Sequence, residues 1–178
     1  CLPGMAPKPT PITEQSEWGT TLQKHPERLI KKGGAVMVHD IQQHTFADIG
    51  DVMDVDVSPD GMTLAFSGSM HSYQPDLYLK ALHGKSISRK SNDPNHAYLW
   101  PKFSPRGDLL AFASDRSGNW DLYLMSVKEN RPPVQLTHGV VDEIHPSWFE
   151  RIDAEGKTIA RKLAYCARNE LNAQWEIW

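Results

Sequence analysis

Residues 57–67 read Val-Ser-Pro-Asp-Gly-Met-Thr-Leu-Ala-Phe-Ser, and residues 103–113 repeat this stretch as Phe-Ser-Pro-Arg-Gly-Asp-Leu-Leu-Ala-Phe-Ala. Each copy continues to the same four residues, Asp-Leu-Tyr-Leu, at 76–79 and at 121–124. The offset between the copies is 46 residues in the first block and 45 in the second. A repeat of this length indicates one supersecondary unit that stacks on its neighbours, so it decides the fold.

A third and more divergent copy follows the first two. In place of Ser-Pro-x-Gly it has a longer hairpin, from Glu150 to about Arg161. Its aligned segments are residues 146–148 with 101–103, 163–165 with 110–112, and 175–178 with 120–123.

The second copy indicates a four-stranded sheet. Ser-Pro-x-Gly at 104–107 is a tight turn, because proline presets φ and glycine accepts a positive φ. Residues 109–113 are apolar at every position, which is typical of a strand covered on both faces. A polar turn at 114–119 leads to a strand with bulky residues at 120–125, and residues 134–137 begin an outer strand. Four short strands in about 45 residues predict a β-propeller blade.

Two other folds fit the pattern less well. A helical solenoid of similar period would need amphipathic runs at 3.6-residue spacing, which these segments lack. An immunoglobulin-like sandwich has many short strands but does not repeat its sequence at this period. The predicted fold class is therefore all-β: β-propeller blades made of four-stranded antiparallel sheets, in a partial propeller with an extended N-terminal arm.

The repeat resembles that of TolB-type β-propellers. Their pattern joins a proline, an aromatic residue, Ser-Pro-Asp-Gly, a strand ending in Ala-Phe, a Ser-Asp-Arg-x-Gly turn, Asp-Leu-Tyr and Leu-Thr. The second copy matches almost throughout, with Arg106 in place of the usual aspartate, whereas the first has residues 68–71 where Asp-Arg would fall. The resemblance begins at about Asp54 and implies the fold, but propellers serve many functions. Because propellers close with four to eight blades, we expect more blades past Trp178 or a partner on the open faces.

The chain is predicted to have two parts. Residues 1–30 form a proline-rich arm, because prolines at 3, 7, 9, 11 and 26 remove backbone donors and block helix and sheet ladders. Residues 31–178 form the propeller segment of about three blades, of which the last is incomplete.

Composition argues against several kinds of partner. Lys and Arg number 19 against 22 Asp and Glu, so the net charge of -3 gives no field that would attract nucleic acid. No run approaches the roughly 18 apolar residues of a membrane-spanning helix. The start of a calcium loop at 54–58 lacks the glycine and glutamate that such a loop needs, so we interpret it as a strand. No cofactor, no metal and no nucleic acid is predicted.

Two residues of the arm are candidate attachment points. Cys1 before a proline-rich tether is typical of a mature bacterial lipoprotein cleaved just before a lipidated cysteine. The alternative is that this cysteine is simply the first residue of a fragment. Trp18 is a lone aromatic residue in a polar stretch, and we expect it to anchor the arm on a partner surface.

His96 and His145 are the candidate partner-binding residues of the propeller. They precede Pro101 and Pro146, where loops that line one face of a propeller are expected. The alternative is that both are ordinary surface histidines. Three tryptophans at repeat positions are interpreted as packing residues: Trp100, Trp148 and Trp175.

The predicted function is non-enzymatic. We expect a protein–protein interaction scaffold within a multi-subunit complex of the bacterial cell envelope, in the periplasm and anchored to the outer membrane through a lipid on Cys1. The alternative is the propeller portion of a prolyl oligopeptidase-type serine peptidase, which similar propellers precede. Because no Gly-x-Ser-x-Gly occurs, its nucleophile would lie beyond Trp178. A third option, a propeller that binds a small ligand or glycan, would need a polar central pocket.

Overall fold

The computed structural model describes residues 11–13, 30–32, 35–37, 50–84, 86–155 and 158–178. The described residues contain strands and turns and no helix, hence no helix that could span a membrane. The chain divides into two compact units, Cys1–Phe46 and Ala47–Trp178. Cys1 and Trp18 lie outside the described residues, so the roles predicted for them stay predictions.

The first unit contains one small antiparallel sheet. Its strands are β1 (Pro11–Thr13), β2 (Ile30–Lys32) and β3 (Ala35–Met37), in the order β1-β3-β2. Strand β1 falls within the stretch predicted to be an extended arm.

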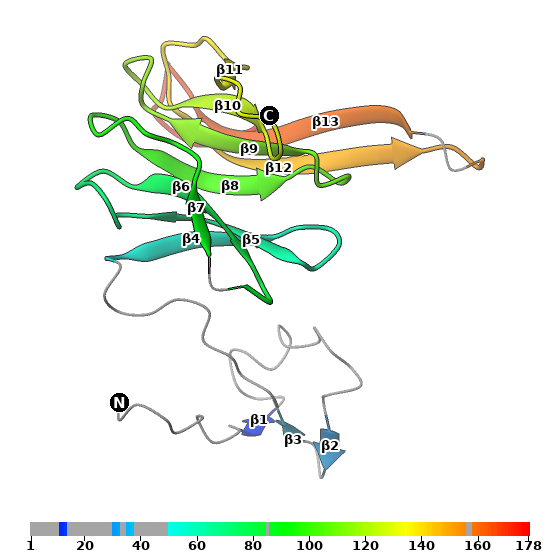
Figure 1. The fold of residues 1–178 in the computed structure, drawn as a ribbon. Coiled ribbons are helices and arrows are strands. Elements are labelled where there is room, and N and C mark those ends of the chain that lie inside the picture. The colour runs from blue at the N-terminus through cyan, green and yellow to red at the C-terminus, as the bar shows by residue number, and fades with distance from the viewer. Residues whose placement is uncertain (1–10, 14–29, 33–34, 38–49, 85, 156–157) are drawn as a thin grey trace. The chain divides into compact units, whose positions relative to one another are not determined.

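The second unit contains three antiparallel sheets in chain order (Figure 1). The first has the order β4-β5-β6-β7: β4 (Val52–Val57), β5 (Thr63–Gly68), β6 (Asp76–Ala81) and β7 (Ile87–Arg89). The second has the same order with β8 (Tyr98–Phe103), β9 (Leu109–Ser114), β10 (Asp121–Ser126) and β11 (Val134–Gln135). The third is β12 (Glu143–Ile152), β13 (Thr158–Arg168) and β14 (Trp175–Ile177).

The three sheets pack one on the next as propeller blades do. Strand β8 packs on β4, β5 and β6, and β12 packs on β8, β9 and β10. Figure 1 shows this stacking from β4 in cyan to β13 in orange, with the long β12–β13 hairpin extending past its neighbours. The all-β fold class is confirmed, with four strands in each of the first two sheets and three in the third, and each of these sheets is called a blade from here on.

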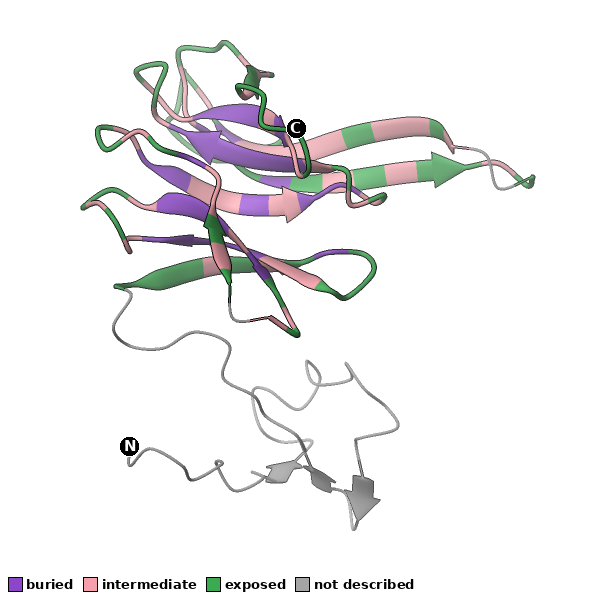
Figure 2. Cartoon of the chain, viewed as in Figure 1, coloured by how far each residue is buried: buried purple, intermediate pink, exposed green. Residues whose placement is uncertain are grey.

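The core lies between the blades. Strands β9 and β10 are buried along most of their length, as the purple ribbon in Figure 2 shows. Phe112 is fully buried and its ring stacks on Tyr123, with 5.8 Å between ring centroids. Burying an aliphatic or aromatic side chain of this size stabilises the folded state by about 1.5–3 kcal/mol. The prediction that residues 109–113 form a strand covered on both faces is confirmed, since only Leu109 is partly exposed.

The Ser-Pro-x-Gly turns keep one hydrogen-bond pattern despite a change of sequence. In the first blade the Ser58 hydroxyl donates to Asp60 over 2.6 Å, and this bond lowers the pKa of Asp60. The second blade has Arg106 at the place of Asp60, and its Ser104 donates instead to Asp108 over 2.7 Å. That hydrogen bond lowers the pKa of Asp108. Arg106 itself contacts the third blade, where its guanidinium donates to the Thr158 hydroxyl over 3.0 Å.

A buried aspartate opens the third strand of each complete blade. Asp76 and Asp121 are almost fully buried. Each accepts hydrogen bonds from the turn before it and from the outer strand after it, so it ties three parts of the blade together. The donors to Asp76 are Ser72, Ser91 and the guanidinium of Arg89 in β7, and those to Asp121 are Ser117, Gln135 and Thr137.

Candidate functional site

The first strand of every blade has a β-bulge at the same place. In each case that strand has one residue more than its partner between two ladder pairs, which bends the strand and re-aims a side chain. The register changes between Met53 and Asp56 in β4, between Leu99 and Lys102 in β8, and between Ile144 and Ser147 in β12.

The bulges hold three large side chains on strained backbone. Asp54, Trp100 and His145 have φ angles of 52°, 54° and 55°. A residue other than glycine in this left-handed region costs about 1–3 kcal/mol, and such residues cluster at functional sites. The three equivalent positions carry a carboxylate, an indole and an imidazole, so the strain repeats whereas the side chain does not.

Proline stabilises two of the bulges. Pro101 follows Trp100 and Pro146 follows His145, and both prolines are fully buried. Because proline has no N–H, it leaves no unpaired backbone donor where the ladder is interrupted. Val55 occupies this place in the first blade and is 58% exposed.

The three bulges line one cavity of about 350 Å³, which we call the bulge cavity. It draws on consecutive positions of three successive blades. Its lining residues are Asp54, Val55, Trp100, Pro101, Lys102, His145, Pro146 and Ser147.

Trp100 is the aromatic centre of the bulge cavity. Its ring centroid lies 4.4 Å from that of His145 and 5.3 Å from that of Trp120, and both pairs are tilted. His145 is exposed and Trp100 is half-buried. The cavity therefore presents an aromatic surface to solvent beside polar side chains, an arrangement typical of binding sites.

The polar side chains at the bulge cavity differ in whether they form ion pairs or hydrogen bonds. Lys102 Nζ lies 3.4 Å from Asp56 Oδ1, and Asp56 Oδ2 accepts the Phe103 backbone N–H over 2.8 Å. These contacts join the first blade to the second. By contrast, the carboxylate of Asp54 and the imidazole of His145 make no hydrogen bond with any described residue.

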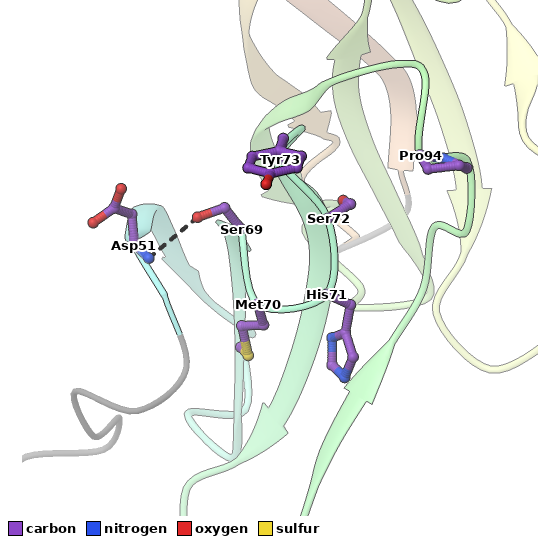
Figure 3. Close-up of a pocket in the computed structure, with 7 residues that line it drawn as sticks. All are labelled: Asp51, Ser69, Met70, His71, Ser72, Tyr73 and Pro94. Carbon is purple, nitrogen blue, oxygen red and sulfur yellow. Dashed lines mark hydrogen bonds between the residues drawn. The ribbon is translucent and has the colours of Figure 1, made fainter.

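A second cavity, of about 690 Å³, lies at the loop between β5 and β6 (Figure 3). This loop has seven residues, 69–75, against six, 115–120, in the second blade, which explains why the repeat offset falls from 46 to 45. Figure 3 shows Tyr73 and Pro94 on separate loops beside the cavity. Its lining residues are Asp51, Ser69, Met70, His71, Ser72, Tyr73 and Pro94.

The loop at 69–75 differs in sequence from its equivalent in the second blade but makes the same kinds of contact. Ser69 accepts the Asp51 backbone N–H over 3.2 Å, as Asp115 accepts that of Ala97 over 2.9 Å in the second blade. His71 lies on Tyr78 with 5.8 Å between ring centroids, and Arg116 lies over the equivalent Tyr123. The polar residues of this loop thus serve the fold, and the bulge cavity is the better candidate site.

A third cavity, of about 400 Å³, borders a buried acid. Glu143 is 8% exposed, and its Oε2 has no hydrogen-bond partner among the described residues. Burial raises the pKa of Glu143, and the negative charge of Asp121 adds to this effect. Glu143 stands 45 residues after Tyr98, so a carboxyl replaces a buried ring at this repeat position.

The structure places the two predicted histidines differently. His145 lies in β12 and lines the bulge cavity. His96 lies in the connection before β8, where its Nδ1 is 3.3 Å from Asp115 Oδ1, and it does not line that cavity. The residue equivalent to His145 is Trp100, because both hold the strained bulge position.

Sequence reasoning missed Asp54 and Trp100 as site residues. Trp100 was expected to serve packing alone, as Trp148 does by donating its indole N–H to the Lys102 carbonyl over 3.0 Å. The available signal was positional: Trp100 and His145 each precede the proline of an aligned repeat. No group of three or more metal-binding side chains gathers within the described residues.

No protein-family model matches the sequence, and no curated protein matches it. A solved structure of a puromycin-hydrolysing peptidase from Mycobacterium tuberculosis is similar over 74% of this chain and 21% of its own, with 15% identity and a TM-score of 0.53. The structure described as TolB from Agrobacterium tumefaciens is similar over 68% of this chain and 46% of its own, with 17% identity and a TM-score of 0.49. TolB from Acinetobacter baumannii is similar over 70% of this chain and 31% of its own, with 21% identity and a TM-score of 0.46.

At these identities the similarity shows the fold alone. The blade order of the chain itself, together with the TM-score of 0.53 to the Mycobacterium tuberculosis structure, confirms the β-propeller fold predicted from the repeat. The chain spans less than half the length of each of these structures.

Proposed function

We propose that this chain is a non-enzymatic protein–protein interaction scaffold that docks into a larger assembly through the bulge cavity. One observation carries the proposal: three successive blades each hold a side chain on strained backbone at one cavity, where the side chains of Asp54 and His145 form no hydrogen bond with another described residue. Strain that repeats without serving the fold is expected where a surface binds something.

A protein partner suits the surroundings of the cavity. Stacked rigid sheets hold the bulges in place, and side chains fixed by such a scaffold bind with little loss of conformational entropy. Aromatic residues are also enriched where interfaces derive most of their binding energy, and Trp100 and His145 supply them here.

The proposed place of action is the periplasm, in a complex held at the outer membrane. The TolB-type repeat and the proline-rich stretch that precedes it support this proposal. Attachment through a lipid on Cys1 is part of the same proposal.

Affinity capture with paired variants tests the scaffold function. The native protein, purified from detergent-extracted membranes, is expected to bring down a reproducible set of envelope proteins that His145→Ala loses. Glu129→Gln, on the exposed turn before β11, serves as the control and should retain the set. Equal capture by His145→Ala and the native protein, or capture of nothing, would contradict the proposal.

The propeller portion of a serine peptidase is the second candidate function. It has one observation in its favour, the TM-score of 0.53 with the Mycobacterium tuberculosis peptidase. Sequencing of the natural protein past Trp178 separates the two functions. A Gly-x-Ser-x-Gly followed by an aspartate and a histidine would support the peptidase, whereas further Ser-Pro-Asp-Gly copies would oppose it.

A further inference from the structure

We propose that the bulge cavity binds a single arginine side chain presented by the protein partner. This inference rests on the proposed function and names the chemistry that the cavity recognises. The cavity offers a carboxylate, an indole and an imidazole from three different blades, so the ligand must be a group that all three can contact.

The charge of the cavity favours a cation. Asp54 and Lys102 line the cavity, and Asp56, which does not line it, lies beside the ammonium of Lys102. The two carboxylates and the one ammonium sum to one negative charge. Lys102 is already engaged by Asp56, so the charge left over belongs to Asp54, whose carboxylate has no partner among the described residues. A partner's cation would supply the missing hydrogen-bond donors.

The aromatic groups favour a flat cation. Trp is the best aromatic platform for a cation within about 6 Å of its ring. Arginine presents a planar guanidinium that stacks on aromatic rings while its N–H groups bind a carboxylate, whereas lysine presents a point charge. Trp100 together with Asp54 therefore suits arginine better than lysine.

The size of the cavity is sufficient for one arginine side chain. Pockets for small ligands run from about 300 to 1,000 Å³, and the bulge cavity, at about 350 Å³, lies at the lower limit. A glycan that stacked on Trp100 would be indifferent to the charge of Asp54. An anion would meet that carboxylate unshielded, because the ammonium of Lys102 is paired with Asp56.

Titration of the whole chain with N-acetyl-arginine amide tests the inference directly. The ligand is expected to shift the Trp100 indole N–H resonance in a nitrogen-15 NMR spectrum and to saturate in the millimolar range. N-acetyl-citrulline amide has the same shape without the charge and should cause no shift. Asp54→Asn should weaken binding of the arginine amide about tenfold, which corresponds to about 1.4 kcal/mol. The control Glu129→Gln removes the same charge elsewhere and should not weaken binding.

Three results would overturn the inference: citrulline amide binding as tightly as arginine amide, equal affinity of Asp54→Asn and Glu129→Gln, or shifts confined to resonances other than Trp100. A normal thermal unfolding curve for Asp54→Asn shows that the comparison uses folded protein. The inference and the proposed function fail separately. Capture of partners that His145→Ala abolishes, with no response to the arginine amide, retires the arginine ligand and leaves the scaffold function standing.

Discussion

The backbone strain of the first bulge can be measured by comparing the stability of glycine and alanine variants at position 54. Glycine should be the more stable of the two there, the reverse of the order at an ordinary strand position. At an ordinary strand position glycine is less stable than alanine by about 0.5–1 kcal/mol, because it loses more conformational freedom on folding. At a left-handed position an L-residue with a Cβ pays about 1–2 kcal/mol that glycine does not pay. With φ at 52°, Asp54→Gly should therefore be more stable than Asp54→Ala by about 0.5–1 kcal/mol.

Urea unfolding of the two variants, followed by tryptophan fluorescence, measures this difference. Lys162 in β13 is the matched control, since it is exposed and has an ordinary strand φ. There the order should reverse, with Lys162→Gly less stable than Lys162→Ala. The comparison within each site cancels the loss of the original side chain. If glycine were the less stable residue at both sites, position 54 would carry no strain and the argument for a repeated, function-driven bulge would be refuted.

Four further outcomes follow from individual residues. Burial raises the pKa of Glu143, so its ionisation opposes folding as pH rises above the ordinary range of a glutamate. In urea titrations at increasing pH, Glu143→Gln should therefore lose less stability than the native chain. Asp121→Ala leaves buried donors without an acceptor and should cost about 3 kcal/mol in thermal unfolding, whereas exposed Glu129→Ala should stay within about 0.5 kcal/mol. Trp18→Ala should weaken partner capture without lowering the melting temperature of the propeller; unchanged capture would retire that anchor. Lipid on Cys1 should make the N-terminal peptide heavier than its unmodified mass in mass spectrometry, and an unmodified mass would end that prediction.

The blade architecture could be predicted from the sequence because it depends on short local patterns of residues. Turn residues, apolar strands and the Asp-Leu-Tyr segments recur at nearly constant offsets. The structure forms a turn at each Ser-Pro-x-Gly and a strand at each of the other segments. The divergent third copy was also aligned correctly, since Leu163 pairs with Trp148 as Leu110 pairs with Phe103. Even the substitution at Arg106 has a local compensation, the hydrogen bond from Ser104 to Asp108.

Only part of the candidate site could be predicted from the sequence, because a β-bulge without glycine has no strong sequence signature. His145 was selected, but His96 was grouped with it because both lie ahead of the proline of an aligned repeat, although Trp100 is the residue that directly precedes Pro101. The property that groups residues at this site is backbone conformation, which joins Asp54, Trp100 and His145 although their side chains share nothing. Only the register of the three sheets reveals that equivalence.

The contact between the rings of Trp100 and His145 forms only if β8 and β12 bring their bulges to one cavity, so its presence decides whether the bulge cavity exists in solution. With ring centroids 4.4 Å apart, proton NMR of the folded chain should show strong nuclear Overhauser effects between the indole and imidazole protons. His145→Gln, with its fold intact, should identify those cross-peaks by removing them. A well-dispersed spectrum of the folded native chain with both rings assigned and no such cross-peak would contradict the account.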